Sequence, residues 1–138
     1  MNRAQFKLSI STNGQGLYLI TDKVREALGE QTNAGVALLN IFIQHTSASL
    51  LIQENSSPSA RRDLENFIDR LVPENQSWHE HLDEGPDDTV SHLKAALTVT
   101  SLTIPMINGQ LQLGTWQGIY LWEHRRAPHT RNLLLTQI

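Results

Sequence analysis

Apolar and polar residues alternate along several short stretches of this chain, and such alternation predicts strands with one buried face. Residues 5–11 place Phe6, Leu8 and Ile10 on the same face. Residues 17–20 follow a turn with two glycines and are predicted to pair with that strand. The other stretches predicted as strands are 36–43, 99–104, 111–123 and 132–137.

The stretch 36–43 is apolar on both faces except at Asn40. This pattern is typical of a central strand that is covered on both sides. His45 follows two residues later, on the face of Ile41 and Ile43. We therefore expect a titratable side chain at the end of a rigid core strand.

The longest predicted helix starts at Ser57-Pro58, an N-cap residue followed by proline at the first helical position. It ends before Pro73, which cannot continue a helix. Its apolar residues recur at helical spacing: Ala60, Leu64, Phe67, Ile68 and Leu71.

Two shorter helices are predicted. One covers 23–28, with Asp22 as its cap and Gly29 as its stop. The other covers 90–97 and follows a capping signal at Asp87-Asp88. Strands dominate and do not alternate with helices, which predicts an α+β fold. We expect one compact domain over residues 1–138, a two-layer, β-sandwich-like sheet core with a few helices at its edge.

Composition removes several classes of function. Charged residues make up 18% and the net charge is −3, which argues against a nucleic-acid partner, because duplex binding favours a basic surface. The chain has no cysteine, so disulfides, thiolate nucleophiles and cysteine-based zinc sites are excluded. The first residues lack a secretory apolar run and no apolar stretch is long enough to span a bilayer. The expected location is the cytoplasm, with no membrane partner.

Histidine supplies the strongest chemical signal, with six residues in the chain. Residues 74–88 are acidic and contain no Lys or Arg. Asp88 precedes His92 by four residues on a predicted helix, so it could accept a hydrogen bond from one imidazole nitrogen and leave the other for a metal. Together with His45 and His81, His92 could form a three-histidine zinc site, although the spacing matches no standard metal-binding signature. The alternatives are a hydrogen-bonded rim histidine and a solvated acidic loop.

Three arginines give the end of the chain a local positive charge. Arg125, Arg126 and Arg131 follow His124 with no acidic residue among them. Guanidinium groups bind phosphate through paired N–H donors, so they could clamp a phosphate. They could equally pair with the acidic segment of this subunit or of a neighbouring one.

Short motifs of polar and small residues follow one another along nearly the whole chain. The most specific are His45-Thr-Ser-Ala-Ser49 and Leu113-Gly-Thr-Trp-Gln-Gly-Ile119. The others are Glu54-Asn55, Arg62-Asp63-Leu64, Val72-Pro73, His81 with Glu84-Gly-Pro-Asp-Asp88, Ser91-His92-Leu-Lys94, Pro105, Gly109 and Glu123. In this order the motifs resemble those of the YjbQ-like family, long described as uncharacterised and often as secondary thiamine-phosphate synthases.

The resemblance implies a compact α+β sandwich, a homotrimer with pockets near subunit contacts, and a divalent metal at His45, His81 and His92. Imidazole nitrogen suits zinc, whereas magnesium prefers oxygen ligands. Zinc is therefore the expected ion and magnesium the alternative.

The activity implied by the resemblance is weak thiamine-phosphate synthase chemistry on phosphorylated small molecules, and the physiological reaction stays open. We therefore expect a metal-dependent transferase or hydrolase. Its expected catalytic residues are Glu84 or Asp87 as the acid/base group and Asp88, which would orient His92. The expected ligand-binding residues are Ser47, Asn55, Lys94, Gln117, Glu123 and Arg125. The alternative is a non-enzymatic trimeric protein that binds a metal or a small ligand.

Overall fold

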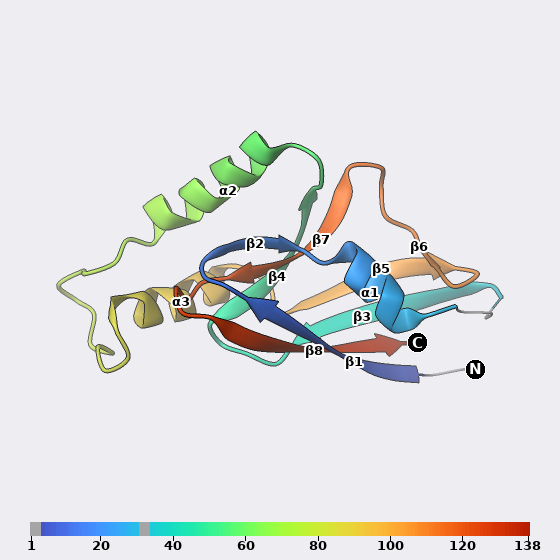
Figure 1. The fold of residues 1–138 in the computed structure, drawn as a ribbon, viewed down its shortest axis with the longest axis horizontal. Coiled ribbons are helices and arrows are strands. Elements are labelled where there is room, and N and C mark those ends of the chain that lie inside the picture. Colours follow the sequence, from blue (N-terminus) through green and yellow to red (C-terminus); the bar gives the residue numbers. More distant parts are fainter. Residues whose placement is uncertain (1–3, 31–33) are drawn as a thin grey trace.

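The computed structural model describes residues 4–30 and 34–138, which form two antiparallel sheets and three helices (Figure 1). The larger sheet has the order β1-β8-β3-β5-β6 and the smaller one the order β2-β7-β4. The strands are β1 (Ala4–Thr12), β2 (Gly16–Leu19), β3 (Val36–Ile43), β4 (Ala48–Glu54), β5 (Ser101–Ile107), β6 (Gln110–Leu111), β7 (Gln117–Glu123) and β8 (His129–Gln137). The α+β fold with a sheet core is confirmed.

The helices are α1 (Thr21–Leu28), α2 (Pro58–Leu71) and α3 (Pro86–Leu97). Ser57 caps α2 as predicted, since its side chain accepts the N–H of Ala60. Asp22 lies inside α1 and forms no cap. Asp87 and Asp88 likewise lie in the first turn of α3, where the helix dipole favours negative charge. None of the helices in the described ranges is long and apolar enough to cross a membrane.

The main hydrophobic core combines residues of both sheets with one face of α1. Its fully buried side chains include Leu39 and Ile41 from β3, and Leu50 and Leu121 from the smaller sheet. A second cluster joins α2 to the smaller sheet through Ile68, Tyr120, Trp122 and Leu17. Gly118 on β7 leaves no room for a side chain, because an added Cβ would lie 2.7 Å from Leu19 Cδ1.

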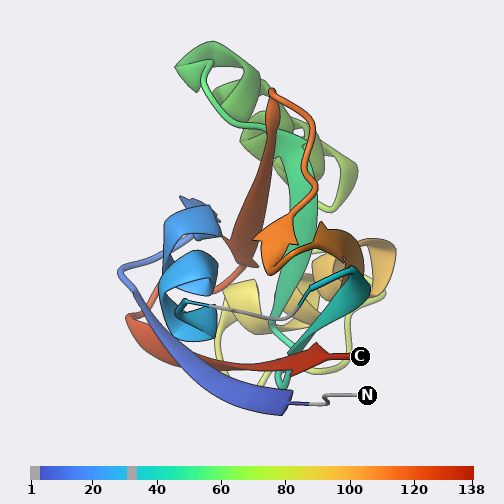
Figure 2. The ribbon, with the colours of Figure 1, turned by 90° about the vertical axis from the view of Figure 1, so that its right-hand side faces the viewer.

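Two apolar surfaces are less covered than their sequence patterns suggest. β3 is central in its sheet, but only one face is buried; Leu38 and Phe42 are each 43% exposed on the other. The prediction of a strand covered on both sides was therefore wrong within the single chain. On α2 only Ile68 is buried, whereas Phe67 is 60% exposed. Figure 2 shows α2 standing away from the larger sheet.

The remaining differences concern strand boundaries. The predicted strand 111–123 is two strands, β6 and β7, separated by the loop 112–116. β4 was not predicted, because its first residues are Ala48 and Ser49, which have no strand preference. The turn at Asn108-Gly109 is confirmed, with φ of 48° and 77° at the two residues.

Candidate metal centre

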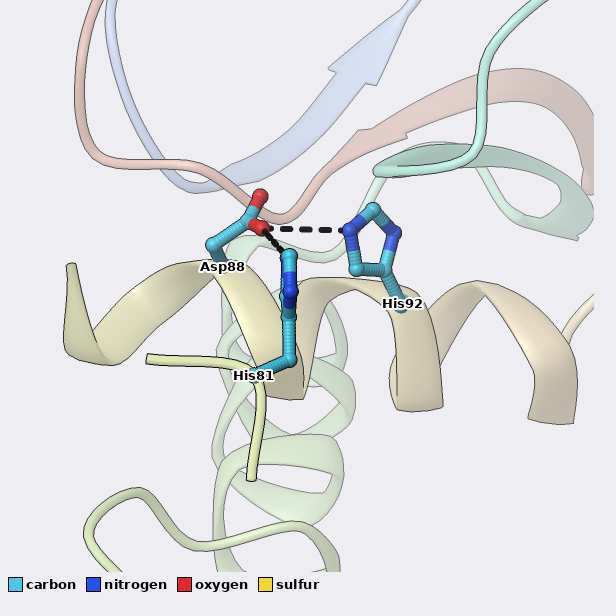
Figure 3. Close-up of side chains that lie close together, drawn as sticks. All are labelled: His81, Asp88 and His92. Carbon is cyan, nitrogen blue, oxygen red and sulfur yellow. Dashed lines mark hydrogen bonds and ion pairs between the residues drawn. The ribbon is translucent and has the colours of Figure 1, made fainter. Parts of the chain in front are cut away.

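Three side chains meet at the beginning of α3: His81, Asp88 and His92 (Figure 3). Oδ2 of Asp88 lies 2.6 Å from Nε2 of His81 and 3.2 Å from Nε2 of His92. One turn of helix separates Asp88 from His92, so both point to the same side. His81 belongs to the segment before α3, which the Thr89 hydroxyl holds by donating to the His81 carbonyl. The candidate ligand atoms lie within 4.8 Å of one another.

The orientation of His92 is fixed by the backbone. Its Nδ1 lies 2.9 Å from the carbonyl oxygen of Thr46, which can only accept, so Nδ1 carries the proton. In the neutral ring Nε2 then has a lone pair directed at Oδ2 of Asp88. His81 presents its Nε2 to the same oxygen. Three electron-rich atoms can share this space only with protons or a cation between them.

Asp88 stays ionised at this position. Burial by itself would raise the pKa of its carboxyl, but the hydrogen bond with His81 and the charges of His92 and Arg125 lower it below its usual range. The same hydrogen bond raises the pKa of His81. The carboxylate is 2% exposed, whereas the side chains of His81 and His92 are 48% and 38% exposed. The cluster is therefore anchored from inside and open to small molecules from outside.

Two further acidic residues of the predicted set, Glu84 and Asp87, differ in their exposure and in their hydrogen bonds. Oε2 of Glu84 lies 3.3 Å from Nε2 of His81, and its side chain is 61% exposed. Asp87 is 7% exposed and accepts from Nε of Arg125 and from the N–H of Arg126, both at 3.0 Å. These contacts outweigh its burial and lower its pKa. The carboxylate of Glu84 is thus exposed beside His81, whereas Asp87 is held by the arginine.

His45, expected as the third histidine ligand, lies outside the cluster. Its Nε2 accepts the N–H of Asn132 at 2.8 Å, and Nη1 of Arg131 lies 3.4 Å from Nδ1. Burial and then the charge of Arg131 lower the pKa of His45. The carboxylate of Asp88 takes the place that the sequence assigned to this imidazole. His45 and His92 nevertheless border the same open depression, of about 480 Å³.

Two expected ligand-binding residues lie in the buried network beside His45. Arg131 donates from Nη2 to Oγ of Ser47 at 3.0 Å and from Nε to Oε1 of Glu123 at 2.7 Å. Glu123 is 0% exposed and also accepts from the hydroxyl of Thr12 at 2.6 Å. Ser47 and Glu123 are thus engaged with this arginine.

The other expected ligand-binding residues are distributed around the molecule. Asn55 and Gln117 line a separate cavity of about 630 Å³ next to α1. Both stabilise the loop before β7; Asn55 donates to the carbonyl of Thr115, and Gln117 accepts the N–H of Gly114. Lys94 is on the opposite side of α3 and donates to Asp69 at 2.6 Å. The structure does not bring these three residues to the cluster.

Sequence reasoning assigned Arg131 to a phosphate or to the acidic segment and missed its buried contacts with Glu123 and His45; it missed the contact of Thr46 with His92 altogether. Arg131 shares the buried face of β8 with Leu133 and Leu135. A charged residue in the apolar positions of a strand pattern indicates a buried ion pair, so the sequence could have predicted this one. The contribution of Thr46 is a backbone carbonyl, which no side-chain pattern can show.

The donor set fits a divalent transition metal. Two imidazole nitrogens and one carboxylate oxygen, with exposed space beside them, match the ligands of catalytic zinc sites. The same set matches the two-histidine, one-carboxylate arrangement of iron(II) sites. The Thr46 carbonyl on Nδ1 of His92 is the type of outer partner that orients a metal-binding imidazole. Magnesium fits less well, because two of the three donors are nitrogens.

Comparisons with known proteins agree on one family. The family model described as UPF0047 protein YjbQ-like matches residues 6–138. A UPF0047 protein of Synechocystis sp. is 44% identical over 93% of this chain and 86% of its own length. The UPF0047 protein YjbQ of Escherichia coli O157:H7 is 42% identical over 96% and 95%.

Solved structures agree as well. A conserved hypothetical protein from Thermus thermophilus superposes with a TM-score of 0.81 at 32% identity, covering 93% of this chain and 96% of its own. An uncharacterised YjbQ/UPF0047 family protein from Clostridium acetobutylicum gives 0.79 at 32% identity, covering 98% and 99%. The chain belongs to the YjbQ/UPF0047 family.

Proposed function

We propose that this protein is a metal-dependent enzyme acting on phosphorylated small molecules, with a divalent ion held by His81, Asp88 and His92. One observation supports this above all: Oδ2 of Asp88 faces Nε2 of both histidines, while Nδ1 of His92 is occupied by the Thr46 carbonyl. This arrangement directs three ligand atoms at one point. Zinc is the preferred ion and iron(II) the second choice.

The ion and the residues around it have separate roles in the proposed reaction. A bound zinc ion polarises a phosphoryl oxygen and lowers the pKa of water. Asp88 supplies the fixed negative charge that retains the ion. Glu84 is the acid/base group, because its carboxylate is exposed and lies within 3.3 Å of His81. In hydrolysis of a phosphate ester, the water oxygen would bond to phosphorus and the ester P–O bond would break. Glu84 would accept the water's proton and return it to the departing alkoxide oxygen, which leaves as the alcohol.

The phosphorylated substrate rests on the family resemblance, and the charges around the cluster favour a monoester. Arg125, which pairs with Asp88, already uses its guanidinium on Asp87, Asp88 and the Glu84 carbonyl. The guanidinium group of Arg125 is therefore engaged within the chain, and the bound metal ion would have to balance the negative charge of the substrate. Thiamine-phosphate synthesis, which must expel pyrophosphate, would need further cations.

We also propose a homotrimer as the working unit. Several large apolar side chains of the described surface are exposed, among them Phe42 on the open face of β3, Leu97 at the end of α3 and Val99 after it. Exposed apolar residues of this number are typical of surfaces that pack against another subunit. The alternative function, a trimer that only binds a metal or small ligand, would use the same surface.

The test compares turnover with and without metal. The protein is stripped with a chelator, reloaded with zinc or iron(II), and assayed with phosphate monoesters and with the two substrates of thiamine-phosphate synthesis. We expect turnover only after reloading. Glu84→Gln should bind metal normally but lose turnover, whereas His92→Asn should lose both. Full turnover in the stripped protein would contradict the proposal, and tight metal binding without any product would favour the binding protein.

A further inference from the structure

We infer that Arg125 is a positioning residue of the metal centre, and that Asp87 acts through it. In this role the arginine fixes which oxygen of Asp88 faces the two histidines, and so sets the affinity for the ion. The inference rests on the proposed metal centre. It replaces the expectation that Arg125 clamps a substrate phosphate.

Each nitrogen of the Arg125 guanidinium group donates a hydrogen bond inside the chain. Nη1 donates to Oδ1 of Asp88 at 2.7 Å, Nε donates to Oδ2 of Asp87 at 3.0 Å, and Nη2 donates to the carbonyl of Glu84 at 3.0 Å. The planar fork therefore bridges α3 and the segment that carries His81. Oδ1 of Asp88 is taken by the arginine, which leaves Oδ2 for the imidazoles.

The arginine is held in turn from two sides. Asp87, in the first turn of α3, binds both its Nε and the backbone N–H of Arg126. From β7, Oε2 of Glu123 accepts the backbone N–H of Arg125 at 3.1 Å. Glu123 is itself fixed by Arg131, so the position of the guanidinium is set by buried groups.

This geometry requires the shape of arginine as well as its charge. The three acceptors lie in different directions around one planar group, and each faces a different nitrogen. A lysine ammonium is a point charge on a flexible stem and cannot reproduce the fork. Arg125→Lys should therefore leave Asp88 free to rotate, although the net charge is unchanged.

The first experiment measures zinc affinity by competition with a chromophoric chelator, for wild type, Arg125→Lys and Arg126→Lys. Arg126 is the matched control because it is adjacent in sequence and its side chain pairs with Glu74. We expect affinity to fall about 10- to 100-fold in Arg125→Lys, the effect typical of losing an outer partner of a metal ligand, and to change less than about twofold in the control. Far-UV circular dichroism should be the same for all three.

The second experiment tests whether Asp87 acts through the arginine. Asp87→Asn alone should weaken zinc binding, and it should add less than about twofold when Arg125 is already lysine, because residues of one network are not additive. This variant also keeps the inference testable if Arg125→Lys does not fold. Wild-type zinc affinity in either Arg125→Lys or Asp87→Asn would overturn the inference. A wild type that binds no ion would instead overturn the proposed metal centre.

Discussion

Asp88 and His81 meet at 2.6 Å although seven residues separate them in sequence. The contact joins the exposed segment before α3 to a carboxylate that is almost completely buried. His92, one helical turn later, presents its Nε2 to the same oxygen at 3.2 Å. A buried carboxylate is thus paired with two accessible imidazoles, so the cluster is open to solvent on the side of the histidines and held inside the fold by Asp88.

Acid should destabilise the protein through His124. Burial, and then the charge of Lys94, lower its pKa to about 3, and its Nε2 lies 2.9 Å from Oγ of Ser49. Because the pKa is lowered in the folded state, the unfolded chain takes up the proton first. The stability that depends on the neutral ring is complete above about pH 6.5 and is lost as the pH falls toward 3.

Between pH 6 and pH 4 this histidine should cost wild type about 1.4 kcal/mol of unfolding free energy per pH unit. Urea titrations of wild type and His124→Asn at several pH values measure this effect. The other titrating groups affect both proteins equally, so the difference between the two curves reports His124. The wild-type curve should fall more steeply. Parallel curves would show that His124 is protonated in the native state.

The buried ion pair of Arg131 and Glu123 gives a second stability prediction. Arg131→Leu leaves the fully buried Glu123 carboxylate without its guanidinium partner, and breaking such a pair costs about 3–5 kcal/mol. Adding Glu123→Leu should recover part of this loss, because no unpaired charge then remains. Chemical denaturation of the single and double variants measures both steps. A double variant less stable than Arg131→Leu alone would contradict the account.

The two apolar faces of α2 should respond differently to truncation. Ile68→Ala opens a cavity against Tyr120 and Trp122 and should destabilise the protein by about 2–5 kcal/mol. Phe67→Ala removes an exposed ring and should change stability by less than about 0.5 kcal/mol in a monomer. Thermal unfolding compares the variants, with light scattering to report the oligomeric state. A large, concentration-dependent loss for Phe67→Ala would place this face in a subunit interface.

The sequence predicted local structure well where one residue's chemistry decides it. Ser57-Pro58 marks the start of α2, Asn108-Gly109 forms its turn, and the spacing of Asp88 and His92 places them on one helix face. In each of these cases the decisive interaction lies within a few residues. The sequence pattern alone therefore contains the needed information.

Prediction from the sequence failed where the partner of a side chain comes from a distant segment. Asn132 and Arg131, far along the chain, occupy the nitrogens of His45 and remove it from the cluster. Arg125 was expected either at a phosphate or on the acidic segment; it pairs with Asp87 and Asp88, but a pattern of charges alone does not choose between the two alternatives. The prediction for β3 failed for the same reason. An apolar strand face indicates that something covers it, but not whether that is another part of the chain or another subunit.

In the proposed metal centre, His81, Asp88 and His92 hold one divalent ion. Isothermal titration calorimetry with zinc, on metal-stripped wild type, Asp88→Asn and His45→Asn, measures the stoichiometry and the affinity of this site. We expect one ion per chain in wild type and in His45→Asn, and at least about a 100-fold loss of affinity in Asp88→Asn, more than is typical for an outer partner. Unchanged affinity in Asp88→Asn, or a wild type that binds neither zinc nor iron(II), would contradict the proposed metal centre.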